Sequence, residues 1–174
     1  MALLTDEGGS EDPEVSGSIF VGGVELTGGK ESPAYATTSD SGAVTTQDAS
    51  ADNYNIKWDG ETLTLKGATI TQGSHENAAI YYDEATDLKI VLEDANTVTG
   101  PDASSGGGSS SDGIHVVDDE VTLTISGSGS LAATGGDAPQ TSGGESYGIY
   151  TWGDAIITER YRRTPPASDA PTAW

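Results

Sequence analysis

Carboxylates recur at turns in the middle of the chain, each group following a short apolar segment. Carboxylate oxygens are the ligands that calcium prefers, and one ion accepts roughly six to eight of them in flexible geometry. If successive turns stack, their like charges repel, and a bound cation relieves that repulsion. No segment matches an EF-hand loop, so a calcium site and a solvated acidic turn that favours solubility are alternatives. The candidate calcium ligands are Asp83, Glu84, Asp87, Asp118, Asp119, Glu120 and Asp154.

Ring side chains recur in a second pattern, directly after the central isoleucine of similar segments. Because Ile80, Ile114 and Ile149 are expected to face inward, the rings that follow them should face outward, one above another. A flat ring on a rigid sheet can hold the apolar face of a sugar, whose hydroxyls then bind nearby polar groups. Stacked rings also stabilise strands without a ligand, which is the structural alternative. The candidate carbohydrate-binding residues are the column Tyr81, His115 and Tyr150, the flanking Trp58 and Trp152, and Lys57 in the equivalent place one repeat earlier.

Composition excludes several other chemistries. The 174 residues include 28 acidic and 7 basic side chains, a formal net charge of −21, and such a field repels the phosphates of nucleic acids. The chain has no cysteine, so it has no disulfide, thiolate metal ligand or cysteine nucleophile. No run approaches the roughly 18 apolar residues of a membrane span, so no membrane insertion is expected. Met1 to Leu4 is too short for the apolar region of a signal peptide. If the protein is secreted, we expect its signal peptide to have been removed from this chain.

Two interleaved repeats must position these candidate residues. The first repeat starts at Leu63 (LTLKGATI), Leu88 (LKIVLEDANTV) and Val121 (VTLTISGSGSL), with a truncated copy at Ala155. The second reads YNIKW, AAIYY, DGIHVV and YGIYTW, and its isoleucines at 56, 80, 114 and 149 are 24, 34 and 35 residues apart. Strand and turn residues in units of this length predict a parallel β-solenoid with one unit per turn.

Alternation within the strands assigns the two faces of the predicted sheet. The inward residues are expected to be Leu63, Leu65, Ile90, Leu92, Leu123 and Ile125, with Thr64, Val91 and Thr124 outward. The segment from Ile19 to Leu26 is expected to form a strand or hairpin that closes the first turn. Asn77 and Asn96 lie at turns, where asparagine tolerates left-handed backbone and bonds neighbouring amides, so structural roles are expected. His75 and His115 are each expected to be a lone exposed histidine.

The repeats as a set, including NYNIKWDGETLTLKGATI, DLKIVLEDANTVTG, DGIHV and YGIYT, resemble a family of secreted carbohydrate-binding proteins of gut bacteria. The similarity covers roughly Ile19 to Thr158. It implies a right-handed parallel β-helix of the pectate-lyase type that carries calcium and binds plant cell-wall polysaccharide without cleaving it. It also implies an extracellular or cell-surface location.

The resemblance raises the question of catalysis, because pectate-lyase-like β-helices include many enzymes. Lyases there use an arginine or lysine base near calcium, but the repeat region has no arginine and its four lysines have no evident acidic partner in the sequence. A hydrolase would need a carboxylate pair, and nothing distinguishes one from the general excess of acid. We therefore expect no enzyme activity.

The expected fold is all-β: a single-stranded right-handed parallel β-helix of about four to five coils over residues 18–159. An acidic flexible arm precedes it at 1–17, and residues 160–174 form a tail unlike the family, a linker or a frameshifted end. The expected function is non-catalytic polysaccharide binding, assisted by calcium for an acidic glycan. The alternatives are a surface adhesin or structural spacer and, third, a fragment of a lyase or hydrolase. Uncapped terminal coils also predict end-to-end association of two copies.

Overall fold

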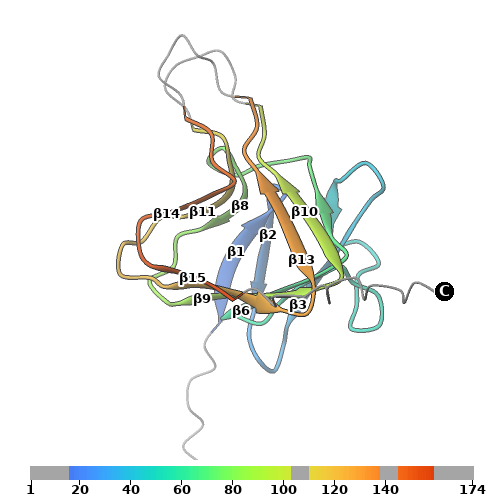
Figure 1. Cartoon of the computed structure of the whole chain (residues 1–174). Coiled ribbons are helices and arrows are strands. Elements are labelled where there is room, and N and C mark those ends of the chain that lie inside the picture. The colour runs from blue at the N-terminus through green and yellow to red at the C-terminus, as the bar shows by residue number, and fades with distance from the viewer. Residues whose placement is uncertain (1–15, 103–109, 138–144, 159–174) are drawn as a thin grey trace, which may run out of the picture.

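The fold is all-β. The computed structural model describes residues 16–102, 110–137 and 145–158, and these contain fifteen strands and no helix (Figure 1). The predicted arm and tail lie outside the described residues, except that Gly17 already begins β1. The strands are β1 (Gly17–Val21), β2 (Val24–Gly28), β3 (Ala34–Thr38), β4 (Val44–Thr45), β5 (Ile56–Trp58), β6 (Thr62–Lys66), β7 (Thr69–Ile70), β8 (Ala78–Tyr82), β9 (Leu88–Glu93), β10 (Ala95–Thr99), β11 (Asp112–Val116), β12 (Leu123–Gly127), β13 (Ser130–Thr134), β14 (Ile149–Thr151) and β15 (Ala155–Ile157).

The strands from β6 onward form three parallel ladders. β6, β9, β12 and β15 pair in that order; β7, β10 and β13 form a second ladder, and β8, β11 and β14 a third. Each ladder takes one strand from each sequence repeat, so the described residues run through three successive three-strand units to β15. No helix of the length and hydropathy needed to cross a membrane occurs among the described residues.

Pairing in register places equivalent side chains above one another. Leu63 pairs with Ile90, which pairs with Ile125, and all three are buried. The inward column of the third ladder is Ile80, Ile114 and Ile149, with Val21 of β1 placed against Ile80. The strands therefore form because every second residue fills one shared core, as the alternation predicted.

The N-terminal strands pair antiparallel and close one end of the ladders. β1 and β2 form a hairpin whose two-residue turn, Gly22 and Gly23, has φ of 56° and 74°, a backbone that glycine adopts without strain. β1 then pairs antiparallel with β8, so the predicted closing hairpin is confirmed.

The prediction that Ile56 begins the second repeat is wrong. Its strand, β5, pairs antiparallel with β3 and β6 and belongs to the seven-stranded sheet, not to the ladder of β8, β11 and β14. Alternation of apolar residues specifies a strand but not the direction of its neighbour, so the parallel and antiparallel copies look alike in sequence. The described residues consequently hold three complete units and β15, fewer than the four to five coils expected.

Asn96 connects three successive units through its side chain. Its Oδ1 accepts the backbone N–H of Ala68 at 2.9 Å, and its amide nitrogen donates to the carbonyls of Glu93, Asp94 and Ser130 at 3.0, 3.3 and 3.2 Å. Asn96 is 2% exposed, so these backbone groups have little access to water in its place. The structural role predicted for Asn96 is confirmed, although the left-handed residue at this turn is Asp94.

We predict that Asn96→Ala lowers the free energy of unfolding by about 2 kcal/mol, because buried backbone groups lose their partner. Urea denaturation followed by circular dichroism measures this change. Thr97→Ala is the matched control, since Thr97 is exposed on the same strand and its loss should cost well under half as much. Equal losses for the two variants would contradict the proposed role of the Asn96 side chain.

Candidate functional site

The predicted ring column is present on the outer face of the five-stranded sheet. Tyr81 of β8 pairs with His115 of β11, and His115 pairs with Tyr150 of β14. The ring centroids of Tyr81 and His115 are 5.8 Å apart, those of His115 and Tyr150 are 5.0 Å apart, and both contacts are edge-to-face. Edge-to-face contacts of this kind are favourable for aromatic rings, so the column stabilises the stacked strands as well as presenting rings.

Three further rings extend the column that the sequence predicted. Phe20 of β1 lies opposite Tyr81, 6.4 Å away, and His75 stacks on Phe20 at 3.7 Å with an interplanar angle of 7°. At the other end Tyr147 stacks on Tyr150 at 5.1 Å and 19°. Phe20 alternates with two buried residues of β1, which marks it as outward, but only the β1–β8 pairing places it in this column. We call these six residues the aromatic column.

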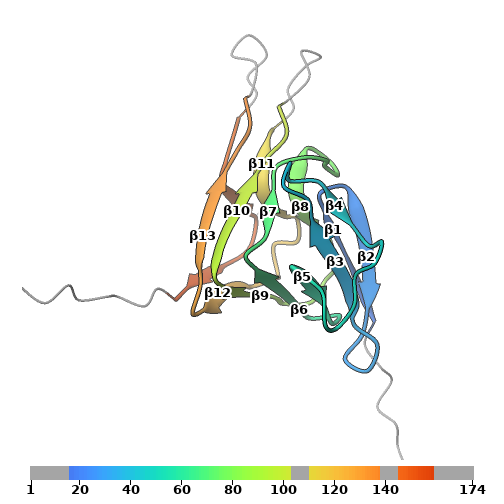
Figure 2. The same cartoon turned by 90° about the vertical axis from the view of Figure 1, so that its right-hand side faces the viewer.

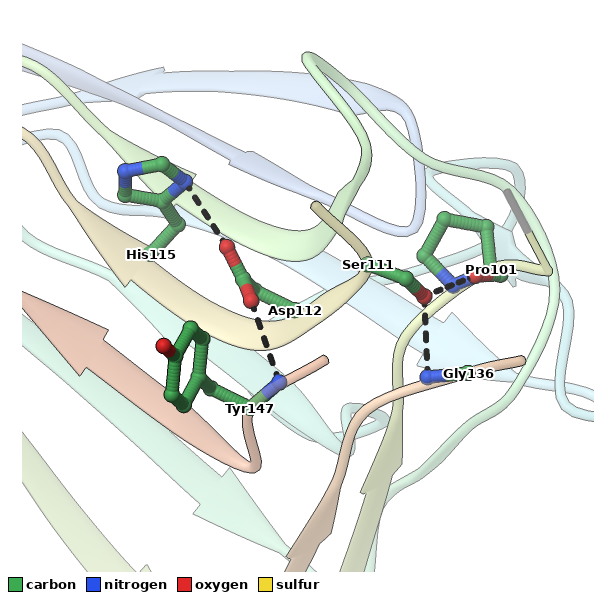
Figure 3. Close-up of polar contacts among 6 residues, drawn as sticks. All are labelled: Pro101, Ser111, Asp112, His115, Gly136 and Tyr147. Carbon is green, nitrogen blue, oxygen red and sulfur yellow. Dashed lines mark hydrogen bonds and ion pairs between the residues drawn. The ribbon is translucent and has the colours of Figure 1, made fainter. Parts of the chain in front are cut away.

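The column has a buried polar contact at its centre. The Oδ2 atom of Asp112 lies 3.1 Å from Nδ1 of His115, and Oδ1 accepts the backbone N–H of Tyr147 at 3.3 Å (Figure 3). The Asp112 side chain is fully buried and that of His115 is 14% exposed. The Asp112–His115 contact lacks hydrogen-bond geometry, and Nε2 of His115 is buried without a partner among the described residues. The expectation of an exposed lone histidine at 115 is therefore wrong, because neighbouring rings cover its imidazole.

Ser111 lies next to this pair but does not act with it. Its hydroxyl contacts the carbonyl oxygen of Pro101 and accepts the N–H of Gly136 at 2.9 Å, and Figure 3 shows it directed to those residues and not to His115. Ser111, Asp112 and His115 are thus close in sequence but lack the nucleophile-to-base contact that acyl transfer requires. Ser111 instead links Pro101, which follows β10, to Gly136, which follows β13.

Trp58 and Lys57 do not belong to the aromatic column. Trp58 is fully buried, packs edge-to-face on Tyr82 at 6.0 Å, and donates its indole N–H to the Gly17 carbonyl at 2.8 Å. Lys57 lies between Tyr35 and Thr64 in the seven-stranded sheet. Both placements correct the prediction and follow from the antiparallel pairing of β5; Phe20 occupies the place next to Tyr81 that was expected for Lys57.

Accessible rings occur at the β14 end of the column. Trp152 directly follows β14 and is 59% exposed, and Tyr147, just before β14, is 36% exposed. Tyr150 between them is partly exposed. Trp152 was expected near the column, and its backbone N–H bonds the carbonyl of Val116 at the end of β11. This end is where a ligand can reach ring surface.

Several of the predicted calcium ligands instead bind backbone or hydroxyl groups of neighbouring turns. Glu84 accepts both the N–H and the hydroxyl of Ser18, at 3.2 and 3.1 Å. Asp87 accepts the N–H of Thr122 in the next unit at 2.9 Å, and Asp118 accepts that of Glu120 at 2.8 Å. Turn carboxylates commonly bond nearby amides in this way. The remaining candidates, Asp83, Asp119, Glu120 and Asp154, are exposed.

The predicted calcium ligands do not converge on one point. No three His, Asp or Glu side chains in the described segments are placed to hold one ion. A calcium ion needs more oxygens than any one of these turns presents. The acidic turns therefore do not fit a preformed calcium site, we derive no step through the ion, and the calcium assignment stays a prediction.

Burial changes the ionisation of the tyrosines around the column. Burial raises the pKa of Tyr81, and the Asp83 and Glu76 carboxylates act in the same direction. Burial also raises the pKa of Tyr82, whose hydroxyl lies 2.7 Å from the Thr86 hydroxyl and 3.0 Å from the Thr86 carbonyl oxygen. Both rings are therefore held in the neutral form.

Comparisons with protein-family models, curated proteins and solved structures gave no match. The resemblance to secreted carbohydrate-binding proteins consequently rests on the sequence motifs alone and stays a prediction.

We predict that the protein loses stability as pH rises above about 10, because tyrosines of the unfolded chain ionise there first. In the folded protein the pKa values of Tyr81 and Tyr82 are raised. The contribution of the two neutral tyrosines to the free energy of unfolding is therefore fully present below about pH 10 and is lost as pH rises through their folded pKa values. Tyr82→Phe should flatten the loss and cost about 1 kcal/mol at neutral pH through the missing hydroxyl contacts. Urea denaturation between about pH 8 and pH 11 measures both effects.

Tyr35→Phe is the control for this series, since Tyr35 lies on β3 of the seven-stranded sheet, whereas Tyr82 lies on β8 of the five-stranded sheet. It gives the slope that results when a tyrosine away from Tyr82 is replaced. If Tyr82→Phe gave the same slope as Tyr35→Phe, ionisation of Tyr82 would not be linked to unfolding.

Proposed function

We propose that the chain is a non-catalytic module that binds polysaccharide at the β14 end of the aromatic column. In this proposal the three ladders are the three faces of a right-handed parallel β-helix, and each three-strand unit is one coil. The strand orders β6-β9-β12-β15, β7-β10-β13 and β8-β11-β14 support a coil, and the strong preference of parallel crossovers for one hand supports the handedness. The resemblance of the repeats to secreted carbohydrate-binding proteins agrees with this proposal and with a location outside the cell.

The observation that carries the proposal is the cluster of accessible rings around β14. Tyr147 and Trp152 are the exposed aromatic side chains of the described residues, and Tyr150 lies between them in sequence and stacks on Tyr147. A sugar can place its apolar face on such rings while its hydroxyls bond adjacent polar groups. Glu145 supplies one such group, since it is exposed, lies two residues before Tyr147 and raises the pKa of the Tyr147 hydroxyl.

Net charge favours a neutral glycan as the ligand. A chain of net charge −21 repels polyuronates, whereas neutral plant polysaccharides bring no charge to the site. Calcium enters the proposal only as an ion that bridges an acidic glycan to exposed carboxylates such as Asp154.

A structural spacer or adhesin is the second candidate, and the inner part of the column favours it. His115 is almost covered and contacts both neighbouring rings edge-on, which is the arrangement of a stabilising ladder and not of a sugar platform. In that function the same column stiffens a stalk, and binding takes place on another surface.

We predict that Trp152→Ala and Tyr147→Ala each weaken binding to a soluble neutral plant polysaccharide about tenfold, the equivalent of about 1.4 kcal/mol. Both side chains are exposed, so the variants should remain folded. Affinity electrophoresis in gels containing xyloglucan or hydroxyethyl cellulose measures retention. Tyr54→Ala is the matched control, because Tyr54 packs on Tyr35 of β3, which lies at the other side of the seven-stranded sheet from β15.

Polygalacturonate with calcium and with EDTA forms the second arm of this experiment. Retention only with calcium would identify an ion-bridged acidic ligand. If no neutral or acidic glycan retains the unmodified protein under either condition, the polysaccharide-binding proposal is wrong and the spacer or adhesin takes its place.

A further inference from the structure

Asp112 carries the one carboxylate that is buried among the described residues. The buried polar side chains there are those of Asn96, Ser111 and Asp112, and the first two are neutral. Moving a carboxylate out of water is unfavourable unless protein groups replace the lost hydrogen bonds. The contacts of Asp112 therefore indicate what this side chain is needed for.

The repeat does not itself require a carboxylate at this position. Asp112 of β11 pairs in register with Ala78 of β8, which is also buried. The preceding unit thus forms the same ladder with a methyl group where this unit has a carboxylate. Both oxygens of Asp112 contact groups at the β14 end of the aromatic column, and its role is specific to that place (Figures 2 and 3).

The carboxylate lies between the two supports of a stacked tyrosine pair. Its Oδ1 accepts the backbone N–H of Tyr147 at 3.3 Å, and its Oδ2 lies 3.1 Å from Nδ1 of His115. Tyr147 stacks on Tyr150 at 5.1 Å, and His115 contacts Tyr150 edge-on at 5.0 Å. One buried side chain therefore holds the first tyrosine through its backbone and contacts the imidazole that packs on the second.

Backbone hydrogen bonds hold the other side of Tyr147. Its carbonyl accepts the N–H of Gly113 at 2.9 Å, and the Gly148 carbonyl accepts that of Ile114 at 3.0 Å. A Cβ atom at Gly113 would lie 2.5 Å from the Gly148 carbonyl oxygen, so glycine permits this close approach. The carbonyl of Tyr147 is thus bound by the backbone of β11, whereas its N–H is bound by the Asp112 side chain.

We propose that Asp112 is the positioning residue of the polysaccharide site, and that its carboxylate holds Tyr147 against Tyr150 before a ligand arrives. This inference rests on the proposed function. A ligand that must order loose side chains binds more weakly, so rings that are already stacked favour binding. Tyr150 covers one face of Tyr147, which leaves the opposite face for the apolar side of a sugar ring. Asp112 is fully buried and acts through Tyr147 without touching the ligand.

Affinity electrophoresis in gels containing xyloglucan or hydroxyethyl cellulose tests this role. Asp112→Ala should weaken retention about tenfold, because Tyr147 is no longer held in place. Asp112→Asn should stay within about threefold of the unmodified protein, since its amide oxygen can accept the same N–H and its nitrogen can donate to His115. Circular dichroism verifies that each variant is folded.

Ser111→Ala is the matched control for the affinity series. Ser111 is also buried and precedes Asp112, but its hydroxyl binds Pro101 and Gly136 and not Tyr147. Its loss should leave retention unchanged. If Ser111→Ala weakened retention as much as Asp112→Ala, or if Asp112→Asn weakened it as much as Asp112→Ala, the proposal would be wrong.

Amide hydrogen exchange followed by NMR tests the positioning without any glycan. In the unmodified protein the Tyr147 amide should be protected, because a buried carboxylate accepts its hydrogen bond. Asp112→Ala should speed its exchange about tenfold, and Asp112→Asn should restore the protection. The Ile114 amide is the internal control, since it bonds the backbone carbonyl of Gly148 and should keep its rate in both variants.

The two measurements separate this inference from the function on which it rests. An unprotected Tyr147 amide in the unmodified protein, or an exchange rate that Asp112→Ala does not change, would overturn the positioning role whether or not the protein binds glycan. Failure of the unmodified protein to bind any glycan, with the exchange results as expected, would overturn the proposed function and leave Asp112 as the residue that orders Tyr147.

Discussion

Pairing in register between successive units is the constraint on which the rest of this structure depends. Every ladder places a residue above its equivalent one unit earlier, so the turns must also repeat, and each repeated turn leaves backbone groups facing its neighbours. Asn96 satisfies such groups in three units with one side chain. Asp87 does the same between two units through the N–H of Thr122. Asn96 and Asp87 are thus part of the pairing itself, and their first role is to hold the register.

The same register produces both the core and the ring column. Ile80, Ile114 and Ile149 stack inward, and the residue after each of them stacks outward by the alternation of the strand. The outer column begins at Phe20 only because β1 pairs antiparallel with β8 in the matching register. A slip of one residue would exchange the two columns, placing rings in the core and isoleucines in water, so the core and the candidate site stabilise the same alignment.

The sequence predicts which residues repeat and which face of a strand they occupy, but it does not predict whether neighbouring strands run parallel or antiparallel. The faces of Leu63, Ile90 and Ile125 and the alignment of Tyr81, His115 and Tyr150 were predictable, because alternation and repeat spacing alone determine them. The burial of Trp58 was not, since it depends on β5 running antiparallel, and the pattern of apolar residues is the same for both directions. The Asp112–His115 contact and the backbone bonds of Asp87 were also unpredictable, because each joins groups placed by pairing between strands and not by the local sequence.

In a stack of this kind, side chains of an inner unit contact the units on both sides of it. Fewer of these side chains are therefore free to bind a ligand. Tyr81 and His115 each meet a ring on both sides, and Ile90 and Ile125 each have a neighbour in the column. Among the described residues, the large apolar side chains that are exposed lie in the last unit or on β15: Tyr147 and Trp152 beside β14, and Ile156 and Ile157 on β15. The two aromatic residues offer ring surface to a ligand, whereas the two aliphatic residues offer no flat surface for a sugar ring. Under the proposed function, ligand binding is therefore expected at the β14 end of the aromatic column, where these rings are exposed.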